Sequence, residues 1–293
     1  MTRIIRALAE ISDSYDALFC DLWGCVHNGH AAYPAAVAAL QAFRAKGGTV
    51  ILMTNAPRPA PAIIATFGRL GIPDDAYDAV VTSGDAAQAG MVMGVVGRKV
   101  YHLGPEKDLP FFTEIPDDLR ALGEVTRVPL QEAEGIVCTG LFDEMTETPD
   151  DYRATLLHAK NEGMKLLCAN PDIVVDYGET RIYCAGALAE RYTEMGGQSL
   201  YFGKPHPPIY DLARRRLAAM DKVIDDRRIL CVGDGIFTDV QGGVSEGIDA
   251  LFITGGLAAN EFGDDPEHPH EALLLPWLDE RQLTPAAAIG RLR

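Results

Sequence analysis

Near its start the chain contains the segment Ala17-Leu18-Phe19-Cys20-Asp21-Leu22-Trp23-Gly24. Its apolar run predicts a buried strand over residues 17–22, and an acidic residue, Asp21, stands where that strand ends. Open parallel sheets bind their ligands in the crevice outside the carboxyl ends of their strands. The segment therefore predicts a strand of a parallel sheet and a residue for chemistry at its end.

The segments on either side predict an α/β fold with a doubly wound parallel sheet, because short apolar runs alternate with helical patterns. Further core strands are expected at residues 49–54, 79–83, 199–203, 228–234 and 250–256. Helices are expected at residues 34–46, 60–70, 207–220 and 238–247.

The middle third of the chain predicts a second, smaller α/β unit of about residues 86–183, inserted into a core formed by residues 1–85 and 184–293. Its strands are expected at residues 99–104, 135–140, 165–170 and 181–185. A helix is expected to begin at Thr148-Pro149. In the acidic tail, Glu267, His268 and His270 are interpreted as a solvated loop rather than a metal site, and a final short helix is expected from Thr284-Pro285.

The composition of the chain restricts its partners. It has 293 residues, is 47% hydrophobic and carries a formal net charge of -16, which makes nucleic acids and anionic membranes poor partners. Its apolar runs are strand-sized and no signal peptide is evident. The six cysteines include no C-x-x-C pair, so buried free thiols and a cytoplasmic location are expected.

Polar residues follow three more of the predicted core strands. They are Thr54-Asn55, Gly203-Lys204-Pro205 and Gly233-Asp234, the last with Asp239 close behind. An aspartate after a strand is as often a helix cap or a turn residue. Four such positions in this order are hard to obtain by chance, and together they predict one site at the edge of the sheet.

This combination resembles the haloacid dehalogenase superfamily, and more closely its class IIA branch of NagD-like and 4-nitrophenylphosphatase-like proteins, in which a cap domain follows the third core strand. The resemblance extends to Asn170-Pro171-Asp172, which is similar to a segment of those caps. Residues 184–188 are similar to the returning core segment, and residues 203–207 to the third motif. The resemblance covers about residues 15–260, and it implies a Mg²⁺-dependent hydrolase that acts on a small phosphorylated metabolite.

The resemblance also implies a role for each strand end. Asp21 would attack phosphorus and form an aspartyl-phosphate. Lys204 would hold Asp21 and the phosphoryl oxygens in place. Thr54 and the backbone N–H of Asn55 would donate hydrogen bonds to the phosphoryl group.

The implied metal site is built from oxygen atoms. Asp21, Asp234 and the backbone carbonyl of Trp23 would bind Mg²⁺, while Asp239 would orient Lys204 or a metal-bound water. Mg²⁺ and Lys204 would make the site locally cationic, which lets an acidic protein bind a phosphate.

Trp23 departs from the phosphatase pattern. Family phosphatases usually carry an aspartate two positions after the nucleophile, which protonates the leaving oxygen and activates water. Indole has no proton that titrates near neutral pH, and losing a general acid typically costs ~10²–10⁴ in rate. Trp23 is interpreted either as a packing residue under the cap or as a stacking surface for a flat ligand.

Three interpretations of this departure stay open. The chain could be a phosphatase restricted to acidic leaving groups, it could take the proton from His27 or the substrate, or it could be a phospho-ligand sensor with little turnover. A phosphonatase would instead need a cap lysine, for which Lys99, Lys107, Lys160 and Lys165 are candidates. Further substrate contacts are expected among Arg58, Asn170 and Asp172, and a homodimer through the cap by analogy.

Overall fold

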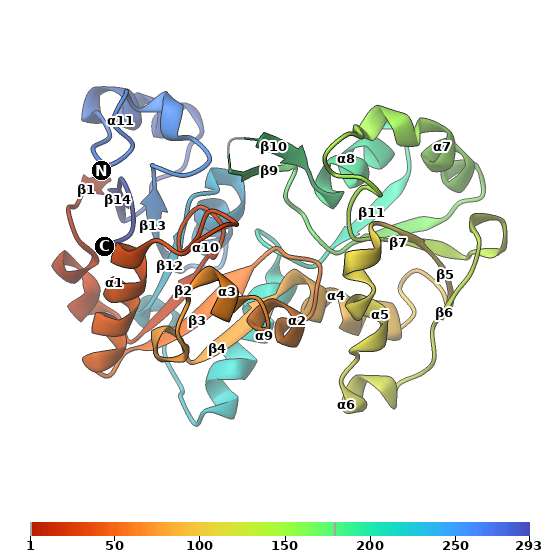
Figure 1. Cartoon of the computed structure of the whole chain (residues 1–293), viewed down its shortest axis with the longest axis horizontal. Helices are drawn as coiled ribbons and strands as arrows, with labels where there is room; N and C mark the ends of the chain where they lie inside the picture. The colour runs from red at the N-terminus through yellow and green to blue at the C-terminus, as the bar shows by residue number, and fades with distance from the viewer. Residues whose placement is uncertain (1, 179) are drawn as a thin grey trace.

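The computed structural model describes residues 2–178 and 180–293 and contains two parallel sheets that lie side by side (Figure 1). The larger sheet has seven strands in the order β1-β14-β13-β12-β2-β3-β4. In chain order these are β1 (Arg3–Ile4), β2 (Ala17–Cys20), β3 (Thr49–Thr54), β4 (Ala79–Thr82), β12 (Ile229–Gly233), β13 (Asp249–Ile253) and β14 (Ala287–Ile289).

Helices cover both faces of the large sheet, which is why its strands are continuous apolar runs. One face packs against α1 (Pro34–Ala45), α2 (Ala60–Ile64) and α3 (Phe67–Leu70). The other packs against α9 (Pro207–Ala219), the π-helical segment Ile236–Val240, which α10 (Gln241–Ser245) follows, and α11 (Glu271–Glu280). Alternate residues of β2 point to opposite faces: Leu18 joins the first core cluster and Phe19 the second.

The order of strands places the ligand crevice. From β2 the chain proceeds outward through β3 and β4, and after the insertion it resumes at β12 on the other side of β2 and proceeds through β13 and β14. The strand order therefore reverses between β2 and β12, which pair directly. Open α/β sheets bind ligands at such a reversal. Asp21 and Asp234 follow these two strands.

The smaller sheet forms the core of the cap. Its five strands are ordered β11-β8-β7-β5-β6. They are β5 (Lys99–Leu103), β6 (Thr126–Arg127), β7 (Gly135–Cys138), β8 (Lys165–Cys168) and β11 (Gln198–Tyr201). One face packs on α7 (Arg153–Asn161) and α8 (Ala185–Glu194), and the other on α4 (Ser83–Val92) and α5 (Pro110–Thr113), with α6 (Asp117–Arg120) nearby.

The expected return to the core at residue 184 is wrong. α8 belongs to a hydrophobic cluster of the cap, and β11 pairs in parallel with β8, so the cap continues to about Tyr201. The strand expected at residues 199–203 is therefore a cap strand rather than a core strand. Its apolar pattern is the same for either sheet, and only the pairing decides between them.

A two-stranded antiparallel hairpin, β9 (Val174–Tyr177) and β10 (Thr180–Tyr183), lies between the two sheets (Figure 1). The sequence predicted its second strand, at residues 181–185, and missed the first. Within the described residues, the structure contains no helix with the length and apolar character needed to cross a membrane.

Three other predictions are corrected, and one is confirmed. The helix expected at residues 60–70 is two short helices, and that at 238–247 is a π-helical segment followed by α10. No helix begins at Thr284; that segment leads into β14, and the tail instead contains α11. The helix start at Thr148-Pro149 is confirmed, because the Thr148 N–H donates to the carboxylate of Asp151 at 2.8 Å.

Candidate active site

A cavity of about 270 Å³ lies at the carboxyl ends of β2 and β12, beneath the β9–β10 hairpin. Core residues form its floor and cap residues its roof. From the core it is lined by Asp21, Trp23, Thr54, Lys204, Asp234 and Asp239, and from the cap by Asp172 and residues of the hairpin. The strand ends that the sequence singled out therefore converge on one cavity.

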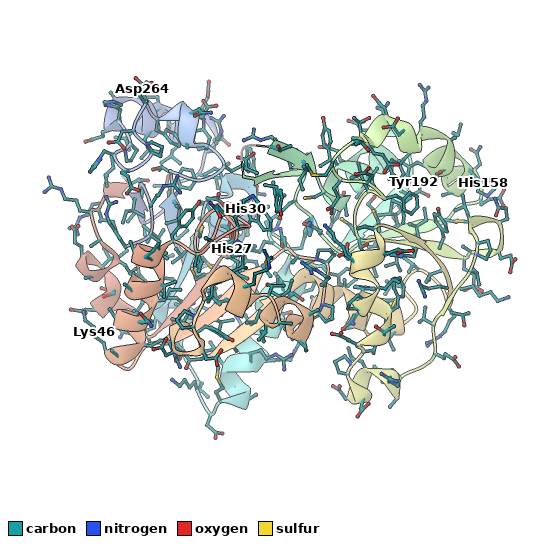
Figure 2. The ribbon with its side chains drawn as sticks, viewed as in Figure 1. His27, His30, Lys46, His158, Tyr192 and Asp264 are labelled. Atoms are coloured by element: carbon teal, nitrogen blue, oxygen red, sulfur yellow. The ribbon has the colours of Figure 1, made fainter. Side chains whose placement is uncertain are left out.

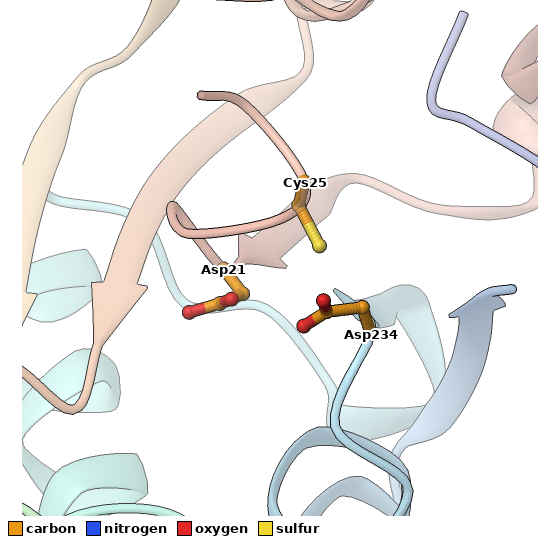
Figure 3. Close-up of side chains that lie close together, drawn as sticks. All are labelled: Asp21, Cys25 and Asp234. Carbon is orange, nitrogen blue, oxygen red and sulfur yellow. The ribbon is translucent and has the colours of Figure 1, made fainter. Parts of the chain in front are cut away.

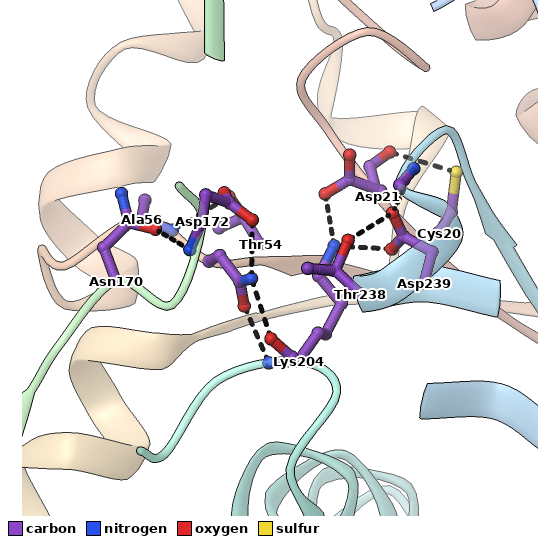
Figure 4. Close-up of polar contacts among 11 residues, drawn as sticks. Cys20, Asp21, Thr54, Ala56, Asn170, Asp172, Lys204, Thr238 and Asp239 are labelled. Carbon is purple, nitrogen blue, oxygen red and sulfur yellow. Dashed lines mark hydrogen bonds and ion pairs between the residues drawn. The ribbon is translucent and has the colours of Figure 1, made fainter. Parts of the chain in front are cut away.

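Lys204 lies between two buried carboxylates (Figure 4). Its Nζ donates to Oδ1 of Asp21 and to Oδ1 of Asp239, each at 2.6 Å. The other oxygen of Asp239 accepts a hydrogen bond from the N–H of Gly235 at 3.0 Å, which fixes that carboxylate. Asp239 thus holds Lys204 against Asp21, which is the arrangement needed for one of the two roles that the resemblance implied for it.

Burial and charge act in opposite directions on this cluster. Burial raises the pKa of Asp21 well above its usual range, and the neighbouring charge of Lys204 opposes that rise. For Lys204, burial lowers the pKa, but the charges of Asp21 and Asp239 outweigh it and raise the pKa well above the usual range. Lys204 is therefore a permanent cation, and a second cation beside Asp21 would favour its ionised, nucleophilic form.

The carboxylates of Asp21 and Asp234 face each other across a gap (Figure 3). Ligand atoms of Asp21, Asp234 and Cys25 all lie within 4.8 Å of one another. Burial, followed by the charge of Asp239, raises the pKa of Asp234 to about 7. A buried carboxylate and a half-buried one beside a single ammonium group are the arrangement that a divalent cation would stabilise, so the donor set fits a hard cation.

Glycines keep Asp234 in place. A Cβ on Gly24, which has φ +78°, or on Gly256 would collide with the Asp234 carboxylate. The N–H of Leu257 donates to Oδ2 of Asp234 at 2.8 Å. Backbone therefore surrounds this carboxylate closely, and only a glycine at each of the two positions permits the contact.

Cys25 is a neighbour of this site that the sequence did not single out. Burial and the charges of Asp234 and Asp21 raise the pKa of its thiol, so the neutral thiol is favoured. Neutral sulfur is a poor ligand for a hard cation. All six cysteines are free and buried, as expected.

Asn55 connects the core to the cap through hydrogen bonds of its side-chain amide. Its Oδ1 accepts from the N–H of Lys204 at 2.7 Å, and its Nδ2 donates to Oδ1 of Asp172 at 2.8 Å and to the carbonyl of Lys204 at 3.1 Å. The hydroxyl of Thr54 accepts from the N–H of Ala56 at 3.2 Å and keeps its own proton available for a ligand. Asn55 therefore positions Lys204, and Thr54 lines the cavity.

The indole of Trp23 packs beneath the cap. Its Nε1 donates to the carbonyl of Asp176 in β9 at 2.7 Å, and its ring lies 6.1 Å from the ring of Tyr177. Gly29 permits this packing, because a Cβ there would lie 2.8 Å from the indole. The packing interpretation of Trp23 is supported, although Trp23 also lines the cavity.

Three predicted substrate contacts do not line this cavity. His27 is buried, its Nδ1 accepts from the N–H of Gly29 at 2.9 Å, and burial lowers its pKa to about 4. Figure 2 shows His27 near His30, in the loop between β2 and α1. Arg58 pairs with Asp108 of the cap at 3.7 Å, and Oδ1 of Asn170 accepts from the N–H of Asp172. Of the expected contacts, Trp23 and Asp172 reach the cavity.

Comparisons with known proteins agree with this geometry. A haloacid dehalogenase-like hydrolase family model matches residues 18–115, and a HAD-hydrolase-like model matches residues 201–276. A crystal structure of a haloacid dehalogenase-like family hydrolase from Brucella suis is 41% identical, with a TM-score of 0.85, and the match covers 99% of this chain and 100% of that one. The chain belongs to the haloacid dehalogenase-like hydrolases.

More distant relatives of this haloacid dehalogenase-like chain agree with a NagD-like class IIA arrangement. The ribonucleotide monophosphatase NagD of Escherichia coli is 23% identical over 83% of this chain and 88% of its own length. The 4-nitrophenylphosphatase of Thermotoga maritima is 20% identical, with a TM-score of 0.68 over 95% of each chain, and shows the same fold. In all of them the resemblance extends across core and cap.

Proposed function

We propose that this protein is a Mg²⁺-dependent phosphomonoesterase that acts on a small phosphorylated metabolite through an aspartyl-phosphate on Asp21. The observation that carries the proposal is the buried ion pair of Lys204 with Asp21, 2.6 Å apart, at the floor of a cavity closed by the cap. Two of the three relatives named above support it, since the proteins from Escherichia coli and Thermotoga maritima are named as phosphatases.

In the first step an oxygen of Asp21 attacks phosphorus. The new O–P bond forms as the bond to the leaving oxygen breaks, and the leaving group departs with the electron pair. Lys204 and the Thr54 hydroxyl lie where charge develops on the phosphoryl oxygens. Asp21, Asp234 and the Trp23 carbonyl would hold Mg²⁺, which supplies charge neutralisation when bound.

In the second step water attacks the phosphorus of the aspartyl-phosphate, which releases inorganic phosphate and regenerates Asp21. Neither Trp23 nor His27 is suited to act as the acid or the base. Indole does not titrate, and the Nδ1 of His27 already accepts a hydrogen bond from the backbone N–H of Gly29. We therefore expect substrates whose leaving group is itself acidic, or which supply their own proton.

A phospho-ligand sensor is the second candidate, and Trp23 favours it because the family acid is missing. The intact set of Asp21, Lys204 and Asp239 favours the enzyme. A protein that only binds phosphate has little need of a buried nucleophile.

The experiment is a phosphate-release screen of phosphorylated metabolites with Mg²⁺, repeated with EDTA and after Mg²⁺ is restored. Asp21→Asn should reduce turnover to background while ligand binding persists. Asp16→Asn is the matched control, because Asp16 lies just before the same strand and pairs with Arg228 on the surface. Turnover by Asp21→Asn above a few per cent of wild type would refute the covalent route. An absence of turnover in wild type with retained binding would favour the sensor.

A further inference from the structure

Two arginines outside the catalytic set line the same cavity. Arg181 extends from β10 of the cap hairpin, and Arg291 follows the last core strand, β14. The two differ in how fully their charge is already satisfied, and this difference indicates which one is available to a ligand.

Arg181 is neutralised within the cavity wall. Its Nε and Nη2 donate to the two oxygens of Asp176 at 2.7 and 3.0 Å. A bidentate pair of this kind satisfies both charges. Arg181 therefore contributes shape and position more than free positive charge.

Arg291 has a weaker partner that it must share. Its Nε lies 3.4 Å from Glu267, and the same carboxylate also binds Arg293. Two guanidinium groups on one carboxylate leave a net positive charge. Glu267 does not line the cavity, whereas Arg291 does.

Neighbouring residues hold the Arg291 guanidinium in place and keep it accessible. It lies 4.9 Å from the ring centroid of Tyr33, which also lines the cavity and supports the cation through its π face. Asn28 and Asn260 line the cavity as well and add neutral polar groups. Arg291 thus places a cationic group in the cavity wall, supported by the ring of Tyr33.

Two glycines lie between Arg291 and the candidate metal site. Gly255 and Gly256 both line the cavity. A Cβ on Gly255 would lie 3.1 Å from the Arg291 side chain, and a Cβ on Gly256 would collide with Asp234. Gly255 therefore packs against Arg291 and Gly256 against Asp234, so two adjacent glycines of the cavity wall connect the two side chains.

We propose that Arg291 forms an anion subsite for a second phosphate or carboxylate on the substrate whose phosphoryl group lies at Asp21. The inference rests on the proposed function and narrows its substrate class to small doubly anionic metabolites. A cavity of about 270 Å³ is at the lower end of the range for small-molecule sites, which agrees with a small substrate.

The test measures binding as well as turnover. Calorimetry on Asp21→Asn with Mg²⁺ compares phosphoglycolate and a hexose 1,6-bisphosphate, which carry two anionic groups, with glycerol phosphate, which carries one. Adding Arg291→Gln should weaken binding of the doubly anionic ligands about 10- to 100-fold, as expected for a lost charge-assisted hydrogen bond, and that of glycerol phosphate less than about threefold. The two doubly anionic probes distinguish carboxylate from phosphate as the second group.

Arg281→Gln is the matched control. Arg281 also lies over an aromatic ring, Trp277, and also has a glutamate at 3.4 Å; its side chain is 27% exposed against 30% for Arg291, but it lies away from the cavity. It should leave binding of all three ligands unchanged.

The subsite would be overturned if Arg291→Gln weakened the binding of all three ligands equally, or if it weakened the binding of none of them. If wild type hydrolyses nothing but the binding preference depends on Arg291, the subsite stands and the proposed hydrolysis fails. If glycerol phosphate is hydrolysed and the preference is absent, the hydrolysis stands and the subsite fails.

Discussion

The core and the cap have the same architecture, a parallel sheet between helices, yet only the core has chemistry at the carboxyl ends of its strands. There β2, β3 and β12 end at or just before Asp21, Thr54 and Asp234. In the cap, β7 is followed by Thr139, whose hydroxyl is hydrogen-bonded to His102 of β5 at 2.9 Å. At this position of the cap sheet, side chains of neighbouring strands bond to each other, while the ends of the core strands are open to a cavity.

The buried carboxylates show the difference most clearly. Asp21 has Lys204 at 2.6 Å, whereas Asp108, which follows β5 and is 1% exposed, has no hydrogen-bond partner among the described residues. Its nearest cation is Arg58 of the core at 3.7 Å. The same topology therefore supports a buried ion pair at the candidate active site in one sheet and a contact between domains in the other, and the partners of each carboxylate decide which.

The largest effect is expected at the core ion pair. Lys204→Met removes the cation between Asp21 and Asp239, so turnover should fall by at least about 10²-fold. The free energy of unfolding should fall by about 3–5 kcal/mol, because two buried carboxylates lose their partner. Denaturant unfolding and phosphate release measure both effects.

Arg58→Met, which removes the cation next to Asp108 of the cap, is the variant to compare with Lys204→Met. Its partner is 3.7 Å away and Arg58 is partly exposed, so we expect a loss of about 1 kcal/mol or less and near-normal turnover. An equal loss of stability in the two variants would contradict the distinction between the two carboxylates.

The second largest effect is expected at Trp23, a core residue that is hydrogen-bonded to the cap. If the acid is missing, rates of wild type should depend steeply on leaving-group pKa, with aryl or acyl phosphates far faster than alkyl phosphates. Trp23→Asp should flatten this dependence and raise alkyl phosphate hydrolysis by up to ~10²–10⁴. Rates over a leaving-group series measure the slope.

Trp23→Phe separates packing from chemistry. It keeps a ring but loses the hydrogen bond to Asp176, so it should cost about 0.5–1.5 kcal/mol of stability without changing the slope. A flat slope already in wild type would mean that another group supplies the proton.

A third effect tests the buried carboxylate of the cap. Burial raises the pKa of Asp108 to about 6, against the opposing charges of Lys107 and Arg58. The folded protein then binds a proton that the unfolded chain releases near pH 4, so this residue's contribution to stability is full below that pH and falls as the pH rises to about 6. Asp108→Asn should remove that fall, which amounts to about 3 kcal/mol at most.

Unfolding of both proteins should be measured from pH 4 to 7, and the difference between them isolates Asp108 from other titrating groups. A difference that does not vary with pH would show that Asp108 is ionised throughout.

The smallest effect compares two buried thiols. The Sγ of Cys25 lies within 4.8 Å of carboxylate oxygens of Asp21 and Asp234, and Cys138 ends β7 in the cap. Because a neutral thiol is a poor ligand for Mg²⁺, Cys25→Ser should change the Mg²⁺ concentration needed for thermal stabilisation by less than about twofold, as should Cys138→Ser. A selective loss of Mg²⁺ affinity in Cys25→Ser would place sulfur in the metal site.

Several elements of the site were predictable because each depends on local pattern. An apolar run that ends in an acid predicts β2 and Asp21, and the same holds for β12 and Asp234. Lys204 lines the cavity, but the sequence placed it after a strand assigned to the wrong sheet. Pairing of β11 with β8 is a contact between distant segments, and no local pattern contains it. The sequence analysis also missed the position of Cys25 beside Asp21 and Asp234, the strand β9 and the helix α11. Each depends on a contact between distant segments or lies where proline and acidic residues obscure the local pattern.

The sequence by itself determined the α/β class and the strand ends that carry Asp21, Thr54 and Asp234, because these follow from residue type and short-range periodicity. The departure at Trp23 followed from the resemblance to the haloacid dehalogenase motifs. Only the tertiary structure decided where the cap ends, that His27, Arg58 and Asn170 lie outside the cavity, and that Arg291 lies within it. Such outcomes depend on which segments pack together, since a side chain's partners and exposure are set by chain segments tens or hundreds of residues away.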